Sequence, residues 1–139
     1  MSDEEIESRG LTRAREAFAV VPYAKFLGLD LCEIKSGEVS VCLDVREELK
    51  QNQGVVHGGA VASLIDTASA FAILTKLQTN ERVTTTDLTI HYLRPIIEGR
   101  LVATAKIIRG GRRMFVVNVE VDNNGKLAAT AVTSYLKLV

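Results

Sequence analysis

The stretch NQGVVHGGAVASLIDTASAFAI, residues 52–73, decides how this chain folds. From about Gly58 to Leu77 the residues are mainly alanine, leucine and other good helix formers, which predicts a helix of about five turns. It is apolar on nearly every side, as is typical of a helix in the middle of a protein. Asp66 is the only Asp, Glu, Lys or Arg within residues 51–75. Because a lone buried charge is costly unless it is paired or hydrogen-bonded, Asp66 is a candidate functional residue.

Strand-like runs lie on both sides of this helix. Two runs before it, at about 29–35 and 38–45, predict a hairpin that turns at Ser36–Gly37. Four runs follow it, and glycine-containing turn signals separate the later ones. The four runs extend over about residues 82–94, 99–109, 113–122 and 127–138. The predicted fold class is therefore α+β, with an antiparallel sheet of about six strands wrapped around one long central helix.

Length and composition bound the other possibilities. With 139 residues, 47% hydrophobic and 24% charged, the chain fits a single domain over residues 1–139. Residues 1–27 predict an N-terminal helical segment, with a helix over 3–20 that Pro22 ends. Seventeen basic residues balance seventeen acidic ones, so overall charge favours neither nucleic acid nor a membrane as a partner. The absence of a signal-peptide pattern indicates a cytoplasmic protein.

The two cysteines, Cys32 and Cys42, lie in the two predicted strands before the helix. They lack the C-x-x-C spacing of a metal or redox motif, and no histidine partner lies close by in the sequence, so neither a disulfide nor a zinc site is expected. Since free cysteine is among the most buried residue types, we expect both to be small core residues.

Gly58 and Gly59 stand where the long helix is predicted to begin. The first amides of a helix have no intrahelical acceptor, and glycine lets a ligand oxygen approach the backbone closely. Such a helix start suits a developing negative charge, as in an oxyanion hole. The alternative is that the two glycines only permit a tight turn, and that Asp66 is an ordinary acid satisfied by Ser63, Thr67 or the backbone.

The spacing of Asp66 from Gly58 indicates a second copy of the chain. Asp66 follows Gly58 by eight residues, which is roughly 12 Å along a helix, so the two cannot act on one carbonyl within one chain. If two central helices pack antiparallel, however, the Asp66 of one subunit approaches the Gly58 of the other. A single sheet layer also leaves one side of the central helix uncovered. We therefore expect an obligate homodimer with two shared sites.

The glycine-rich motif resembles that of a known family. Gly54, His57, Gly58 and Gly59, followed by Asp66 nine residues after the histidine, resemble the hotdog-fold acyl-CoA thioesterases of the phenylacetate-degradation (PaaI-like) branch. The resemblance extends to TTTDLTIHYLRP at 84–95 and RGGRRMFVVNVEVDNNGKLAATAVTSY at 109–135, and covers about residues 28–138. It implies hydrolysis of an acyl-CoA thioester to a carboxylate and coenzyme A, with no metal or organic cofactor. It also implies dimers that pair into a homotetramer.

The resemblance implies a role for each motif residue. The N–H of Gly58 polarises the thioester carbonyl, beside Gly59 in the substrate site, and Asp66 of the partner subunit acts either as general base on water or as nucleophile. Thr85 stands where relatives carry a Ser or Thr that helps to hold the water. The implied role of His57 is to order the loop rather than to act as a base.

One position departs from the family pattern. Relatives usually carry an asparagine before the glycine motif that helps to fix the thioester, whereas this chain has Gln51 there and Asn52 next to it. Either residue has the required amide, so the sequence leaves the choice between them open.

Arginines near two strand connections are candidates for binding the phosphates of coenzyme A, because a guanidinium pairs well with phosphate. They are Arg94, Arg109, Arg112 and Arg113. The alternative is a solvated hairpin end. For the whole protein, the main alternative function is a non-catalytic hotdog protein that binds acyl-CoA without cleaving it. A hotdog dehydratase or hydratase is less consistent with the sequence, because the His and acid spacing of those enzymes is absent.

Overall fold

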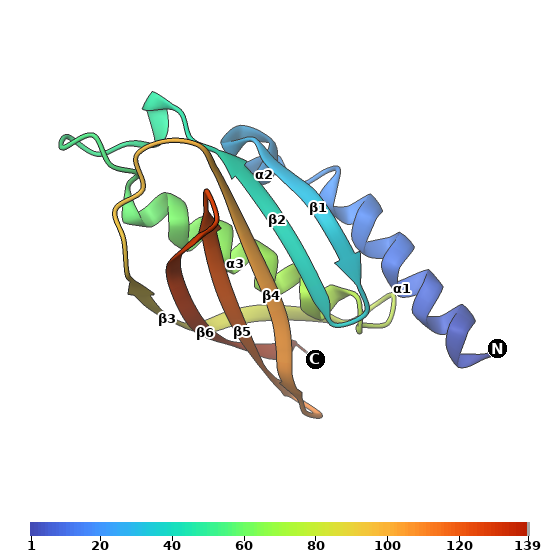
Figure 1. The fold of residues 1–139 in the computed structure, drawn as a ribbon. Coiled ribbons are helices and arrows are strands. Elements are labelled where there is room, and N and C mark those ends of the chain that lie inside the picture. The colour runs from blue at the N-terminus through green and yellow to red at the C-terminus, as the bar shows by residue number, and fades with distance from the viewer. Residues whose placement is uncertain (139) are drawn as a thin grey trace.

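A six-stranded antiparallel sheet curls around one long helix, α3 (Gly58–Leu74), in the computed structural model, which describes residues 1–138 (Figure 1). The strands lie in the order β1-β2-β4-β5-β6-β3. Their bounds are β1 Leu29–Lys35, β2 Glu38–Asp44, β3 Arg82–Tyr92, β4 Arg100–Gly110, β5 Met114–Asn123 and β6 Lys126–Leu138. The predicted fold class is thus confirmed, and the predicted strand ends agree with the structure to within two residues.

The concave face of the sheet supplies most of the core around α3. Alternating side chains of β2, β4 and β5 point at the helix and are fully buried; they include Val39, Val41, Leu101, Ala103, Val117 and Val119. On α3 the buried face consists of Val61, Leu64, Ile65, Ala68, Ser69, Phe71, Ala72 and Ile73. This interdigitation of branched side chains with a helix rich in small residues explains why so apolar a helix lies inside the fold.

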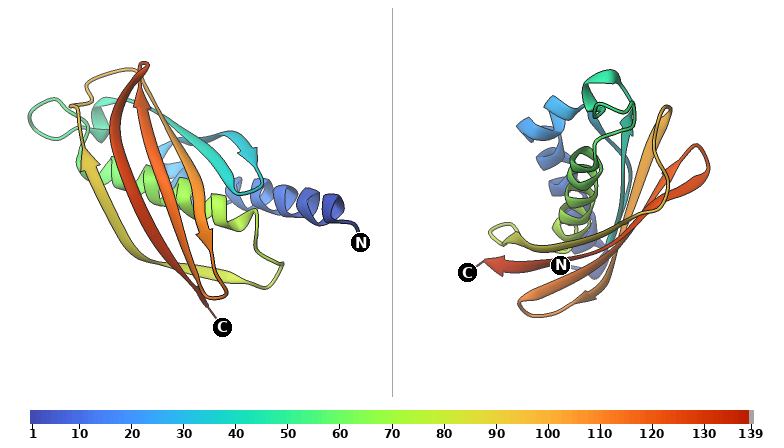
Figure 2. Two further views of the ribbon diagram at one scale, coloured as in Figure 1. Left: turned by 60° about the horizontal axis from the view of Figure 1, so that its bottom comes forward. Right: turned by 90° about the vertical axis from the view of Figure 1, so that its left-hand side faces the viewer.

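One side of α3 remains half-buried in the single chain. We call it the open face; its residues are Ala62, Ser63, Asp66, Thr67, Ala70 and Leu74, spaced three and four apart. The sheet covers the opposite side, and two N-terminal helices lie beside α3 away from the sheet (Figure 2). The open face is therefore bordered by strand β3 on one side and by the N-terminal helices on the other.

The N-terminal segment forms two helices where the sequence predicted one. Helix α1 (Asp3–Phe18) has a capping box at Ser2 and Glu5, and Phe18 packs edge-on against Phe71 of α3. Helix α1 ends before Pro22 is reached, and Pro22 begins a short helix, α2 (Pro22–Leu27), because proline is well suited to the first turn. Gly28 ends α2 with φ of 80°, a conformation that favours glycine.

The expectation for the cysteines is wrong. Cys32 and Cys42 form a disulfide between β1 and β2, and Cys32 is exposed, although Cys42 is buried as expected. A β-bulge explains the difference, because the register of the two strands shifts between Leu31 and Glu33. In a regular hairpin the two cysteines would point to opposite faces of the sheet. The extra residue puts both on the convex face.

Helix α3 ends three residues earlier than predicted. The hydroxyl of Thr75 donates to the carbonyl of Ala72 and accepts a hydrogen bond from the N–H of Gly37 at 2.8 Å. Beyond it the chain tightens, since the amides of Lys76 and Leu77 bond to carbonyls three residues back. No helix within residues 1–138 is long and apolar enough to cross a lipid bilayer.

Candidate active site

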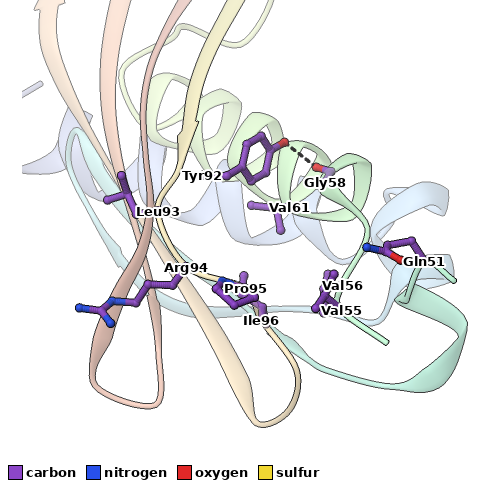
Figure 3. Close-up of a pocket in the computed structure, with 10 residues that line it drawn as sticks. All are labelled: Gln51, Val55, Val56, Gly58, Val61, Tyr92, Leu93, Arg94, Pro95 and Ile96. Carbon is purple, nitrogen blue, oxygen red and sulfur yellow. Dashed lines mark hydrogen bonds between the residues drawn. The ribbon is translucent and has the colours of Figure 1, made fainter. Parts of the chain in front are cut away.

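The start of α3 borders a cavity of about 360 Å³. Its lining comes from the loop before α3, the first turns of the helix and the connection from β3 to β4: Gln51, Val55, Val56, Gly58, Val61, Tyr92, Leu93, Arg94, Pro95 and Ile96 (Figure 3). The two loops are joined by a hydrogen bond of 2.8 Å from the N–H of Val56 to the carbonyl of Ile96. The glycine motif therefore opens into a mostly apolar hollow.

His57 caps the helix. Its Nδ1 accepts a hydrogen bond from the N–H of Gly59 at 2.7 Å, and its own N–H donates to the carbonyl of Leu49 at 2.8 Å. The cap uses the amide of Gly59, whereas the N–H of Gly58 has no acceptor within residues 1–138. Of the two glycine amides, that of Gly58 is thus the one left to bind an external oxygen at the positive end of the helix dipole.

Tyr92 holds the first peptide of α3 from the strand side. Its hydroxyl donates to the carbonyl of Gly58 at 2.7 Å, as Figure 3 shows. Withdrawal of this hydroxyl from water raises the pKa of Tyr92, which keeps it a donor. The ring comes so close that a Cβ at position 58 would lie 3.3 Å from the tyrosine oxygen. A side chain at position 58 would therefore crowd Tyr92, which favours glycine at this position.

Asp66 lies on the open face of α3 and is satisfied by two hydroxyls of the sheet. Oδ1 accepts a hydrogen bond from Thr85 Oγ1 at 2.9 Å and from the hydroxyl of Tyr135 at 2.7 Å. Burial, and then the bond to Asp66, raise the pKa of Tyr135 well above its usual range. These two hydrogen bonds explain how an apolar helix keeps one carboxylate.

The register of the sheet explains why these two hydroxyls meet. Thr85 on β3 and Tyr135 on β6 are direct cross-strand partners, so both point to the helix side. A β-bulge follows at once, between Thr85 and Asp87. Without it, the pairing of Leu88 with Thr133 would continue to place Thr86 opposite Tyr135. The bulge thus selects Thr85 from three consecutive threonines.

The two candidate amides, Gln51 and Asn52, differ in where they lie. Gln51 lines the cavity, with its side-chain oxygen accepting a hydrogen bond from the N–H of Gln53. Asn52 is exposed in the adjoining turn and does not line the cavity.

The predicted phosphate-binding arginines do not form one cluster within a chain. Arg94 lies at the cavity, but Arg109, Arg112 and Arg113 surround the turn between β4 and β5, at the far end of the sheet. Strand β4 separates the two groups by 11 residues, or roughly 35 Å. Arg113 instead lies near Glu81, beyond the C-terminal end of α3.

Sequence reasoning missed two residues of the site. They are Tyr135, which donates to Asp66, and Tyr92, which donates to the carbonyl of Gly58. Their contacts depend on strand register, which a sequence pattern shows poorly. Within residues 1–138, no three His, Cys, Asp or Glu side chains gather closely enough to bind a metal ion.

Comparison with known proteins identifies the family. Residues 53–129, more than half of the chain, match the thioesterase superfamily. The chain is 34% identical over 112 residues to a protein of Saccharolobus solfataricus named "Putative esterase SSO2140", with 80% of this chain and 79% of that protein covered. It is 29% identical over 132 residues to the medium/long-chain acyl-CoA thioesterase YigI of Salmonella typhimurium, covering 84% of this chain and 85% of the relative.

A solved structure agrees with this result. The PaaI protein from the phenylacetic acid degradation operon of Escherichia coli superimposes with a TM-score of 0.88 at 25% identity, with 96% of each chain covered. This likeness confirms the predicted hotdog fold and the resemblance to the PaaI-like branch. The chain thus belongs to the thioesterase superfamily, a family of thioester hydrolases.

Proposed function

We propose that the protein is an acyl-CoA thioesterase, which converts an acyl-CoA and water into a carboxylate and coenzyme A. The observation that carries the proposal is that one helix has two groups suited to thioester hydrolysis, but at positions too far apart to act together within one chain. The N–H of Gly58 has no acceptor among residues 1–138 and lies at the cavity, and the carboxylate of Asp66 lies on the open face. The relative named as a medium/long-chain acyl-CoA thioesterase supports coenzyme A esters as the substrate class.

Gly58 polarises the thioester. Its N–H donates to the carbonyl oxygen, and it donates more strongly as that oxygen gains negative charge in the transition state. Loss of one such donor commonly costs about 10²–10³ in rate. Tyr92 and His57 support the role from both sides, because one bonds the carbonyl of Gly58 and the other occupies the next amide. Gln51 lines the same cavity, which supports Gln51 over Asn52 as the amide that contacts the thioester.

Asp66 of the partner subunit completes the site. In the general-base route its carboxylate accepts a proton from water, while the water oxygen bonds to the carbonyl carbon and the coenzyme A thiolate leaves. In the nucleophilic route the carboxylate itself bonds to that carbon, the thiolate leaves, and water then hydrolyses the mixed anhydride. Both routes need Asp66 within reach of the carbonyl that Gly58 holds, which roughly 12 Å of helix prevents within one chain.

Two features of the single chain support a dimer. The open face of α3 leaves small and apolar side chains half-exposed. Next to it, β3 pairs only with β6, so its other edge has unpaired backbone groups within the described part of the chain. Free strand edges are usually covered in folded proteins. Antiparallel packing of two α3 helices, with the β3 edges side by side, covers both features and places Asp66 opposite Gly58.

In this dimer, arginines that lie far apart within one chain can bind the same coenzyme A. The turn with Arg109, Arg112 and Arg113 lies toward the C-terminal end of α3. This is the end of the helix opposite to Gly58 of the same chain. In the antiparallel dimer that turn extends beyond the Gly58 cavity of the partner. Phosphates of coenzyme A would then lie between Arg94 of the subunit that holds the carbonyl and the arginine turn of the subunit that supplies Asp66.

The test is release of free thiol from a panel of aromatic, medium-chain and long-chain acyl-CoAs. We expect wild type to cleave at least one class, and Asp66→Asn to lose roughly 10³-fold or more in kcat while its thermal unfolding midpoint stays within a few degrees. Binding of coenzyme A esters without cleavage would instead support the non-catalytic alternative. Full activity of Asp66→Asn would make the carboxylate structural.

A further inference from the structure

The carboxylate of Asp66 is held by one oxygen only. Both hydroxyl donors, Thr85 at 2.9 Å and Tyr135 at 2.7 Å, bond to Oδ1. No group within residues 1–138 donates to Oδ2. The two oxygens of a carboxylate can accept about four hydrogen bonds in all, so one half of this group is satisfied by the protein and the other half is left free.

The two donors are held in place differently. Tyr135 is 1% exposed, and its ring is fixed in the core between the sheet and α3. Its hydroxyl also lies 3.1 Å from the backbone oxygen of Asp66, but a phenol has one hydrogen, and the closer, charged Oδ1 is the better acceptor. Thr85 is exposed on edge strand β3 and is aimed by the bulge that follows it. One donor is therefore a rigid anchor, and the other lies at the surface that the partner would cover.

A buried polar cluster continues beneath this anchor. Thr133, two residues before Tyr135 on the same face of β6, donates to Ser69 Oγ at 3.0 Å. Ser69 lies one turn after Asp66 on α3, and both Thr133 and Ser69 are fully buried. Polar pairs in a core are costly unless they are satisfied, so strand β6 is locked to α3 at this point. This contact fixes the position of β6 along α3, and with it the position of the Tyr135 hydroxyl relative to Asp66.

We propose that Tyr135 is a positioning residue which, together with Thr85, fixes Oδ1 of Asp66 so that Oδ2 alone is presented to the reacting centre. The proposal rests on the proposed thioesterase function and assigns the reacting oxygen within it. In the general-base route Oδ2 takes the proton of water, and in the nucleophilic route Oδ2 forms the bond to the acyl carbon. In either route a carboxylate free to rotate would spend much of its time with the wrong oxygen or angle.

The first test is Tyr135→Phe, which removes the hydroxyl and keeps the ring. We expect kcat to fall about ten- to a hundred-fold, with KM for the acyl-CoA changed by less than about two-fold, because the lost contact acts on the reacting group and not on substrate binding. The matched control is Thr104→Val, which removes another cross-strand hydroxyl bond of the same sheet, to Ser40 at 2.9 Å. It should leave kcat unchanged.

A double-mutant cycle separates positioning from a general loss of structure. In the Asp66→Asn background, Tyr135→Phe should lower the residual rate no further, since the group it positions is already gone. A purely structural effect would instead add to the loss from Asp66→Asn. If Tyr135→Phe does not fold, Thr85→Val replaces it in the cycle. Thr85→Ser should then restore the rate that Thr85→Val loses.

The outcomes distinguish this proposal from the proposed function. If wild type cleaves no acyl-CoA, the thioesterase function fails. If wild type is active but Tyr135→Phe keeps the wild-type kcat, or lowers it equally with and without Asp66, the positioning role is overturned and the thioesterase function stands.

Discussion

The two faces of α3 differ in their residues and in what they contact. The buried face, with Leu64, Ile65 and Phe71, packs in the core, where Phe71 also contacts Phe18 of α1. The open face, with Ala62, Asp66 and Ala70, has only partial cover within one chain. Composition also differs, because the open face has the carboxylate and the hydroxyls of Ser63 and Thr67, whereas the buried face has most of the branched and aromatic side chains. The difference lies in which face the sheet reaches, and it separates residues that stabilise the fold from those available for chemistry and assembly.

The largest expected effect is on stability, from the buried face. Leu64→Ala removes a fully buried side chain and leaves a cavity, so the free energy of unfolding should fall by about 2–5 kcal/mol. Urea denaturation measures this loss, and kcat per folded molecule should change little. If activity fell as steeply as stability, the division of labour between the two faces would be wrong.

The next effect concerns assembly through the open face. If Asp66 meets the partner's Gly58, the two-fold axis passes near the midpoint of these positions, Ala62. Ala62→Glu would then place two like charges against each other and weaken the dimer about ten-fold or more, which sedimentation velocity measures. Thr12→Glu, on the exposed side of α1, is the control and should leave the dimer intact.

A crosslink tests which position of α3 lies at the two-fold axis of the dimer. Ala62→Cys should form an intersubunit disulfide on mild oxidation, seen as a dimer on a non-reducing gel. Ala70→Cys should not, because the two copies of position 70 would lie roughly 24 Å apart along the helices. Crosslinking at position 70 in place of position 62 would show a different helix register.

A smaller effect is expected at the helix start. Tyr92→Phe removes the hydrogen bond to the carbonyl of Gly58 but leaves the N–H of Gly58 free. A single neutral hydrogen bond contributes about 0.5–1.5 kcal/mol, so kcat/KM should fall by roughly two- to ten-fold. Steady-state thiol release measures it. A loss as large as that of Asp66→Asn would mean that the tyrosine contacts the substrate directly.

The smallest effect is expected at the arginine turn. Arg112→Ala removes one exposed charge, and exposed ion pairs contribute about 0.2–1 kcal/mol, so KM should rise by less than about five-fold. The rise should be larger at low salt, because exposed charges are screened. Dephospho-coenzyme A esters, which lack one phosphate, give the matched comparison. Unchanged KM at low ionic strength would place the nucleotide elsewhere.

The sequence was sufficient for the central helix, the six strands and their order along the chain, but not for the short helix α2 or for the exact strand register. The apolar run of α3, the alternation in β5 and the glycine turns each identify one element with little dependence on the rest of the chain. The β-bulges near Cys32 and at Thr86, in contrast, cannot be identified from the sequence pattern. Each adds a single residue that leaves local composition unchanged, yet it decides which side chains share a face.

Those bulges account for the main errors and omissions. The disulfide was missed because regular pairing points Cys32 and Cys42 apart. The role of Tyr135 was missed because only the observed register places it opposite Thr85. The spacing between Gly58 and Asp66 depends on helix geometry alone, so it could be calculated from the sequence. The expectation of a shared site comes from that spacing.

Restoration of activity by mixing two inactive variants tests the shared site most directly. Asp66→Asn keeps Gly58, and Gly58→Val, which crowds Tyr92, keeps Asp66. After unfolding and refolding together, half of the dimers should be mixed, and each mixed dimer has one intact site. About a quarter of wild-type activity should therefore return. The control, Asp66→Asn refolded with a chain that carries both substitutions, should recover none. If the mixture of single variants also stays inactive although mixed dimers form, Gly58 and Asp66 of different subunits do not share a site.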